Sequence, residues 1–235
     1  MSNIAENPTL CLVHGAWHGA WVWDQMRTRL TDFAIEAVDL PSSGPDVREL
    51  GTFQDDVSTI RTMVETIDGP VVAVAHSYGG MPTSEALCGL SNVVGVIYIA
   101  AWVLDSGQSA AAAVAEERGL PDWWDVHPED GYMDALRPAQ IFYNDVDPAL
   151  ATQYIARLNH QSLEVGNYSL QDVVWKYVPT SYIICERDAG LAPIFQESMS
   201  NRTGRVARLN AGHSPFLSQP DELAEEMRLA IASFG

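Results

Sequence analysis

The sequence predicts an α/β fold in which a mostly parallel central sheet is flanked by helices and carries one insertion. Near-continuous apolar runs such as VVAVA at 71–75 are typical of central parallel strands, whose two faces are both covered. Segments with helical spacing alternate with these runs, which favours right-handed crossover connections. No buried-strand run occurs between about 106 and 177. We therefore expect a small, mainly helical cap over the sheet there.

The expected strands are short apolar runs closed by turn residues. In order, they are 10–14, which ends at Gly15; 34–40, which ends at the turn Pro-Ser-Ser-Gly-Pro; 71–75; 93–101; 180–185; and 205–209. The strand at 71–75 is the most apolar of these and is followed directly by a turn and a helix. Like the run at 93–101, it is typical of a central parallel strand.

The expected helices follow from periodicity and from signals at their ends. They span 23–30, 52–67, 81–90, 110–118 and 148–159, and the last one begins near 218. The helix at 52–67 places Phe53, Val57 and Ile60 on one stripe. For the last helix, Ser218 is the expected cap and Pro220 suits the first turn. Residues 1–105 and 178–235 are thus predicted to form the core, with 106–177 as the cap.

Composition narrows the class of protein. The chain has 235 residues, 47% hydrophobic and 19% charged, with a formal charge of −18. This acidity disfavours binding to nucleic acids and to anionic membranes. No 18-residue apolar run and no signal-peptide pattern appear, so a cytoplasmic protein is expected. The three cysteines lie far apart without metal spacing, and we expect them to be buried, reduced thiols.

The segment VVAVAHSYGGM, residues 71–81, has the strand–turn–helix setting of a nucleophilic serine. The nucleophile, Ser77, must adopt strained dihedral angles so that its Oγ projects from the turn. Residues two before and two after it must be small, because strand and helix approach each other there. Ala75 and Gly79 satisfy this rule, although Ala75 departs from the strict G-x-S-x-G pattern. The alternative is a plain turn whose serine caps the helix.

A serine nucleophile needs a base, and His213 is the best candidate among six histidines. It follows the last expected strand, at the sheet edge where Ser77 also lies. His76 is adjacent to Ser77, and adjacent side chains diverge at such a turn. The remaining histidines are interpreted as turn or surface residues: His14, His18, His127 and His160.

The base needs a carboxylate partner. Asp188 follows the strand at 180–185 and produces the chain order Ser, Asp, His. Glu186 and Asp105 remain as alternatives, because each also follows a strand. The oxyanion hole is expected from two backbone amides, those of Tyr78 and Ala16.

Several other residues are candidates for the substrate pocket. Gly15 allows the chain to fold close to the site, and His18 lies in the same turn. Aromatic residues of the cap could form the wall, although such clusters are more often plain core. The complete set is Gly15, His18, Trp123, Trp124, Phe142, Tyr143 and Tyr154. An aromatic wall would imply a substrate with an apolar or aromatic part.

Beyond these derivations, the segments LVHGAWHGAWVW, VVAVAHSYGGM, ICERDAGLAP and NAGHSPFLSQPDELAE resemble the α/β-hydrolase superfamily. More narrowly, the chain is similar to the branch that holds plant methyl esterases, plant hydroxynitrile lyases and small bacterial esterases. The resemblance covers nearly the whole chain and is weakest between 116 and 177. It implies the α/β-hydrolase fold with a helical cap, a mechanism without cofactor or metal, and a homodimer as a candidate assembly.

The lyases of this branch differ from its esterases around the triad. The resemblance implies that a lyase carries Thr or Asn at the position of Gly15 and Lys directly after the catalytic histidine. Here that second position is Ser214. Both departures favour an esterase that cleaves a small to medium carboxylic ester through an acyl-enzyme. The alternatives are a C–C lyase, a lactone or amide hydrolase, and a non-catalytic receptor. Ser77 excludes a dehalogenase, which needs Asp as its nucleophile.

Overall fold

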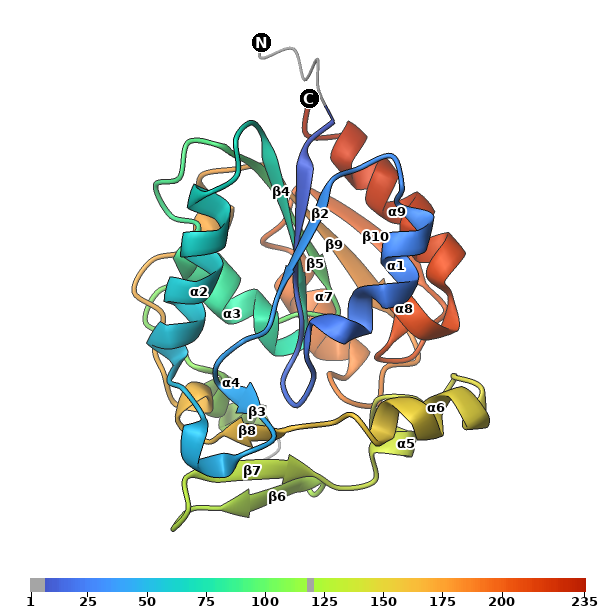
Figure 1. The fold of residues 1–235 in the computed structure, drawn as a ribbon. Coiled ribbons are helices and arrows are strands. Elements are labelled where there is room, and N and C mark those ends of the chain that lie inside the picture. Colours follow the sequence, from blue (N-terminus) through green and yellow to red (C-terminus); the bar gives the residue numbers. More distant parts are fainter. Residues whose placement is uncertain (1–6, 118–120) are drawn as a thin grey trace.

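The computed structural model describes residues 7–117 and 121–235, and it confirms the predicted α/β class (Figure 1). The central sheet has six strands, all parallel, in the order β10-β9-β5-β4-β1-β2. These strands are β1 (Thr9–Val13), β2 (Ile35–Val38), β4 (Val71–His76), β5 (Val93–Ile99), β9 (Thr180–Cys185) and β10 (Arg205–Leu209). The two strands beside β4 are β1 and β5, so the most apolar run occupies the interior of the sheet. Every residue of β4 is buried.

Helices cover both faces of this sheet, as a parallel sheet requires. Helices α2 (Phe53–Glu65) and α3 (Gly80–Ala86) lie on one side, and α1 (Asp24–Arg29) and α9 (Pro220–Ala232) on the other (Figure 1). Thr52 and Asp55 form a reciprocal capping box that fixes the start of α2. The remaining core helices are α7 (Pro193–Ser200) and α8 (Pro215–Ser218). Within the described ranges, no helix is long and apolar enough to cross a membrane.

The cap contains helices and an antiparallel sheet that the sequence did not predict, and one strand of this sheet, β3, comes from the range 1–105 that was expected to be core. Strands β3 (Ser43–Gly44), β8 (His160–Ser162), β7 (Tyr132–Ala135) and β6 (Trp124–His127) pair in that order. Helices α4 (Ala110–Glu117), α5 (Pro138–Ile141) and α6 (Pro148–Ile155) complete it. Strands β6 and β7 form a hairpin, with Gly131 at φ 77° in its turn, where a mainly helical cap was expected. Its strands are only half-buried and mix polar with apolar residues, so they lack the signal of a buried run.

Two local expectations were wrong. Ser218 does not cap the last helix, because it ends the separate short helix α8, and Gln219 precedes α9 without a side-chain cap. Cys88 is only half-buried, unlike Cys11 and Cys185, because it lies just past the end of α3 rather than in a strand. All three cysteines are free thiols.

Candidate active site

Ser77 stands at the end of β4 with the strained backbone that the sequence predicts for a nucleophile turn. Its φ is 52°, in the left-handed region that residues other than glycine rarely adopt. The N–H of Trp102 donates to its carbonyl oxygen at 3.0 Å. A Cβ on Gly79 would overlap the carbonyl oxygen of His14. The turn therefore needs glycine at this position, and neighbouring contacts hold the strained serine in place.

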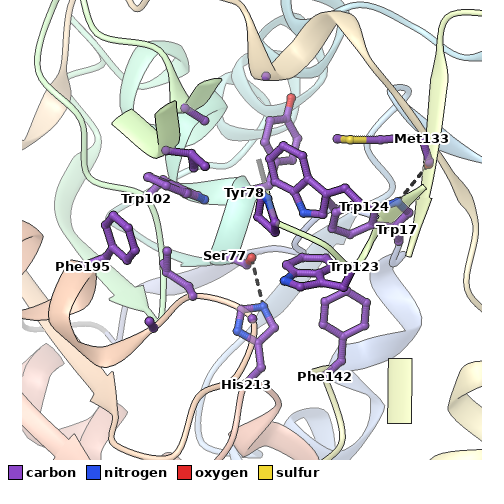
Figure 2. Close-up of a pocket in the computed structure, with 18 of the residues that line it drawn as sticks. Trp17, Ser77, Tyr78, Trp102, Trp123, Trp124, Met133, Phe142, Phe195 and His213 are labelled. Carbon is purple, nitrogen blue, oxygen red and sulfur yellow. Dashed lines mark hydrogen bonds between the residues drawn. The ribbon is translucent and has the colours of Figure 1, made fainter. Parts of the chain in front are cut away.

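His213 lies in the loop between β10 and α8 and reaches Ser77. Its Nε2 is 3.1 Å from Ser77 Oγ (Figure 2), and its Nδ1 is 2.7 Å from Asp188 Oδ2. A carboxylate can only accept, so the Nδ1–H donates to Asp188 and the free Nε2 can accept from the serine hydroxyl. The three side chains thus form one hydrogen-bonded line, built from the carboxyl ends of three strands of the sheet.

Asp188 accepts hydrogen bonds from other groups in addition to His213. The amides of Gly190 and Leu191 donate to its Oδ1 at 2.7 and 2.9 Å. Gln196 Nε2 donates to Oδ2 at 2.8 Å, and its Oε1 accepts from the amide of Cys185. This buried carboxylate has every lone pair engaged and is fixed in orientation. Gln196 was not among the residues expected at the site, because a glutamine in a helix carries no motif.

The alternative carboxylates lie elsewhere. Asp105 forms an exposed ion pair with Lys176. Glu186 is exposed, and its amide donates to the carbonyl of Leu209. Among the three candidates, Asp188 is the one that contacts His213.

The other histidines near the site are neutral and structural. Burial lowers the pKa of His14 to about 4 and that of His18 to about 3. It also lowers the pKa of His76 well below its usual value. His76 Nε2 donates to the carbonyl oxygen of His213 at 2.8 Å, so it supports the backbone of the base and points away from Ser77. Because their pKa values are lowered, His14, His18 and His76 add no positive charge to the site at neutral pH.

The turn after β1 lies against the serine. A Cβ on Gly15 would come within 2.7 Å of Ser77 Cβ, so only glycine permits this approach. Ala16 lines the same cavity as Ser77, as does Tyr78. Trp17, the next residue of the turn, has φ 63° and is strained like the serine. The two segments expected to supply oxyanion amides therefore flank Ser77.

A cavity of about 420 Å³ opens above Ser77 and His213, with a mainly apolar wall. Trp123, Trp124 and Phe142 line it, as expected (Figure 2). The wall also contains apolar residues that the sequence did not predict, because they come from loops and a helix of the core and from separate parts of the cap: Trp17, Trp102, Val114, Met133, Val165, Leu191 and Phe195.

Four expected pocket residues lie outside this wall. Gly15 packs beneath Ser77. His18 is buried, and its Nε2 accepts from the hydroxyl of Tyr143 at 2.9 Å, so the two side chains satisfy each other behind Phe142. Tyr154 packs on Trp21 with ring centroids 5.5 Å apart. These aromatic residues are core, which is the more common fate of such clusters.

The charges around the cavity are few. Asp122 is the one acidic residue of the described wall, and it pairs with Arg137 at 2.8 Å. No lysine or arginine belongs to the described wall. In the ranges 7–117 and 121–235, no group of three or more His, Cys, Asp or Glu side chains is arranged to hold a metal ion.

Known proteins that are similar to this chain in sequence or fold include hydrolases and esterases. A model of the alpha/beta hydrolase family matches residues 12–226. The chain is 29% identical to an alpha/beta hydrolase of Aspergillus novofumigatus, over 95% of this chain and 96% of that protein. It is 27% identical to Methylesterase 7 of Arabidopsis thaliana, over 90% and 92%. The crystal structure of polyneuridine aldehyde esterase shares the fold, with a TM-score of 0.81 and 22% identity over 97% of this chain and all of that one.

Proposed function

This chain belongs to the alpha/beta hydrolase family, and we propose that it is a serine esterase in which Ser77 is the nucleophile, His213 is the general base and Asp188 is the carboxylate partner of the base. The observation that carries the proposal is the continuous line of hydrogen bonds from Asp188 through His213 to Ser77. The relatives named as esterases support the same reaction class.

The proposed reaction is two-step acyl transfer. Ser77 Oγ attacks the ester carbonyl while His213 Nε2 takes its proton, and Asp188 stabilises the imidazolium that forms. The amides of Ala16 and Tyr78 hold the negative oxygen of the tetrahedral intermediate, and one such donor is worth about 3 kcal/mol. His213 then protonates the leaving alcohol. Water attacks the acyl-enzyme by the same route and releases the acid.

The wall of the cavity indicates the class of ester. Trp102 and Phe195 form one aromatic pair, with centroids 6.3 Å apart. Trp17, Trp123, Trp124 and Phe142 form a second cluster. Figure 2 shows Ser77 and His213 between the two groups. An ester with an apolar or aromatic group on each side of its carbonyl would fill both.

Substitution of the nucleophile tests the function. Ser77→Ala should abolish hydrolysis of nitrophenyl esters and labelling by a fluorophosphonate, whereas Ser106→Ala, at an exposed serine, should change neither. Turnover that survives in Ser77→Ala would refute the proposal. A panel of neutral esters should show higher kcat/KM for benzyl arylacetates than for the matching methyl esters, if both aromatic groups contact substrate.

A lyase reaction on the same residues is the second candidate, and the site gives it less support. The side chain after His213 is the buried Ser214, so no ammonium group stands there to stabilise a departing cyanide. Release of cyanide from mandelonitrile at a rate comparable with ester turnover would favour the lyase over the esterase.

A further inference from the structure

A buried chain of hydrogen bonds connects the two segments that flank Ser77. It begins at the N–H of Trp17, which donates to Gln161 Oε1 at 3.1 Å. Gln161 Nε2 donates to the carbonyl oxygen and to Oγ of Ser42, both at 2.9 Å. Ser42 Oγ donates to Asp56 Oδ2 at 2.6 Å, and the hydroxyl of Tyr78 donates to the same oxygen at 2.6 Å. Gln161, Ser42 and Asp56 have no exposed surface.

The cap holds Trp17 at three points. Besides Gln161, the N–H of Asn159 donates to the carbonyl oxygen of Trp17 at 2.7 Å. The indole N–H of Trp17 donates to the carbonyl oxygen of Met133 at 2.9 Å. Gln161 lies in β8, Met133 lies in β7, and Asn159 directly precedes β8. The left-handed backbone of Trp17 is a conformation that persists only when its surroundings determine it, and here the surroundings are the cap sheet.

We propose that Gln161 is a positioning residue for the oxyanion hole, through which strand β8 of the cap orients the turn that carries Ala16. The inference rests on the proposed function, because it needs Ala16 and Tyr78 to donate to the oxyanion. Gln161 does not line the cavity, so it acts through Trp17 on one side and through Ser42 and Asp56 on the other. Its amide is suited to this place, since it accepts from one segment and donates to the next. The cap therefore contributes to transition-state binding as well as to the pocket wall.

The test replaces Gln161 by an apolar residue of similar length. Gln161→Met should lower kcat roughly 10- to 100-fold, because the Ala16 amide is displaced rather than removed. KM should stay within about threefold, since Gln161 does not contact the substrate. A trifluoromethyl ketone, whose adduct with Ser77 carries an oxyanion, should lose affinity by the same factor as kcat/KM. Gln140→Met, a matched change on the exposed face of cap helix α5, should alter none of these values.

Other outcomes would overturn the inference. Wild-type kcat in folded Gln161→Met, a rise in KM alone, or unchanged affinity for the ketone would each refute the positioning role. If Gln161→Met does not fold, Ser42→Ala is the second variant, because it interrupts the path of hydrogen bonds with a smaller change in the side chain. We expect kcat and affinity for the ketone to fall together, roughly threefold or more. Turnover that depends on Ser77 but not on Gln161 or Ser42 would leave the proposed function standing and remove this inference alone.

Discussion

Replacing Gly15 by alanine tests the close approach on which the proposed site depends. The new Cβ would lie 2.7 Å from Ser77 Cβ and 3.0 Å from His76 Nδ1, whereas ordinary Cβ contacts begin near 3.4 Å. The serine or the turn must therefore shift by about 0.7 Å, the difference between 3.4 and 2.7 Å. Since a misplacement of about 1 Å can cost a hundredfold in rate, we expect kcat/KM to fall roughly 10- to 100-fold.

The same substitution has a separate effect on stability. Overpacking costs about 1–3 kcal/mol, and the smaller entropy of the unfolded alanine chain returns about 0.4–1 kcal/mol. The net loss in the free energy of unfolding should thus be about 1–2 kcal/mol, small enough to leave the protein folded. Nitrophenyl-ester kinetics and urea unfolding measure the two quantities. Gly44→Ala, whose Cβ would make an ordinary 3.5 Å contact, is the control.

Either of two results would contradict the expected effect of Gly15→Ala. If folded Gly15→Ala keeps kcat/KM within twofold of the wild type, the distance between the turn and Ser77 does not limit the reaction. A loss of activity that merely follows the loss of folded protein would count against it equally.

Three further predictions concern buried ionisable groups. Asp188→Asn should lower kcat about 10⁴-fold, because the histidine tautomer is no longer fixed, while Glu186→Gln in the same loop should change it less than twofold; equal losses in both variants would contradict the assignment. Burial raises the pKa of Asp56 to about 6 in the folded protein. Since folding favours the protonated carboxyl, Asp56 adds to the free energy of unfolding below about pH 4, and this stabilisation is lost as the pH rises to about 6. Urea unfolding from pH 4 to 7 should therefore show the wild type losing up to about 3 kcal/mol relative to Asp56→Asn, and parallel profiles would exclude this titration. Burial also raises the pKa of Cys88 to about 11, and because the other two cysteines are fully buried, a thiol reagent should modify at most one slow thiol in native protein and three in denaturant.

Much of the core was predictable because its signals are local. The run at 71–75 is apolar throughout and falls within β4. The less apolar runs at 180–185 and 205–209 coincide with β9 and β10, although β10 is an edge strand with two arginines. The turn at Ser77 was recognisable because sterics demand small neighbours, and Gly79 does face a backbone oxygen. His213 and Asp188 could be named because each follows a strand of one parallel sheet, and such strands bring their carboxyl ends to the same edge.

The cap was less predictable because its pairing is not local. Gly44 of β3 pairs with His160 of β8, which follows it by 116 residues. Neither segment has a strand pattern of its own. The cap aromatics look alike in the sequence, yet Phe142 reaches the cavity while Tyr143 turns to His18. Successive side chains point in different directions, and only the packed backbone decides which of them faces the site.

By itself, the sequence determined the parallel core, the nucleophile turn and the identity of the three residues in the hydrogen-bonded line, because strand apolarity, small-residue sterics and chain order are properties of short segments. The tertiary structure alone decided the shape of the pocket wall, the four donors around Asp188 and the path from Trp17 through Gln161 to Tyr78. Gln161 lies more than a hundred residues from both Trp17 and Ser42. The remaining contacts depend on the directions of side chains, which are set only when the whole chain has packed.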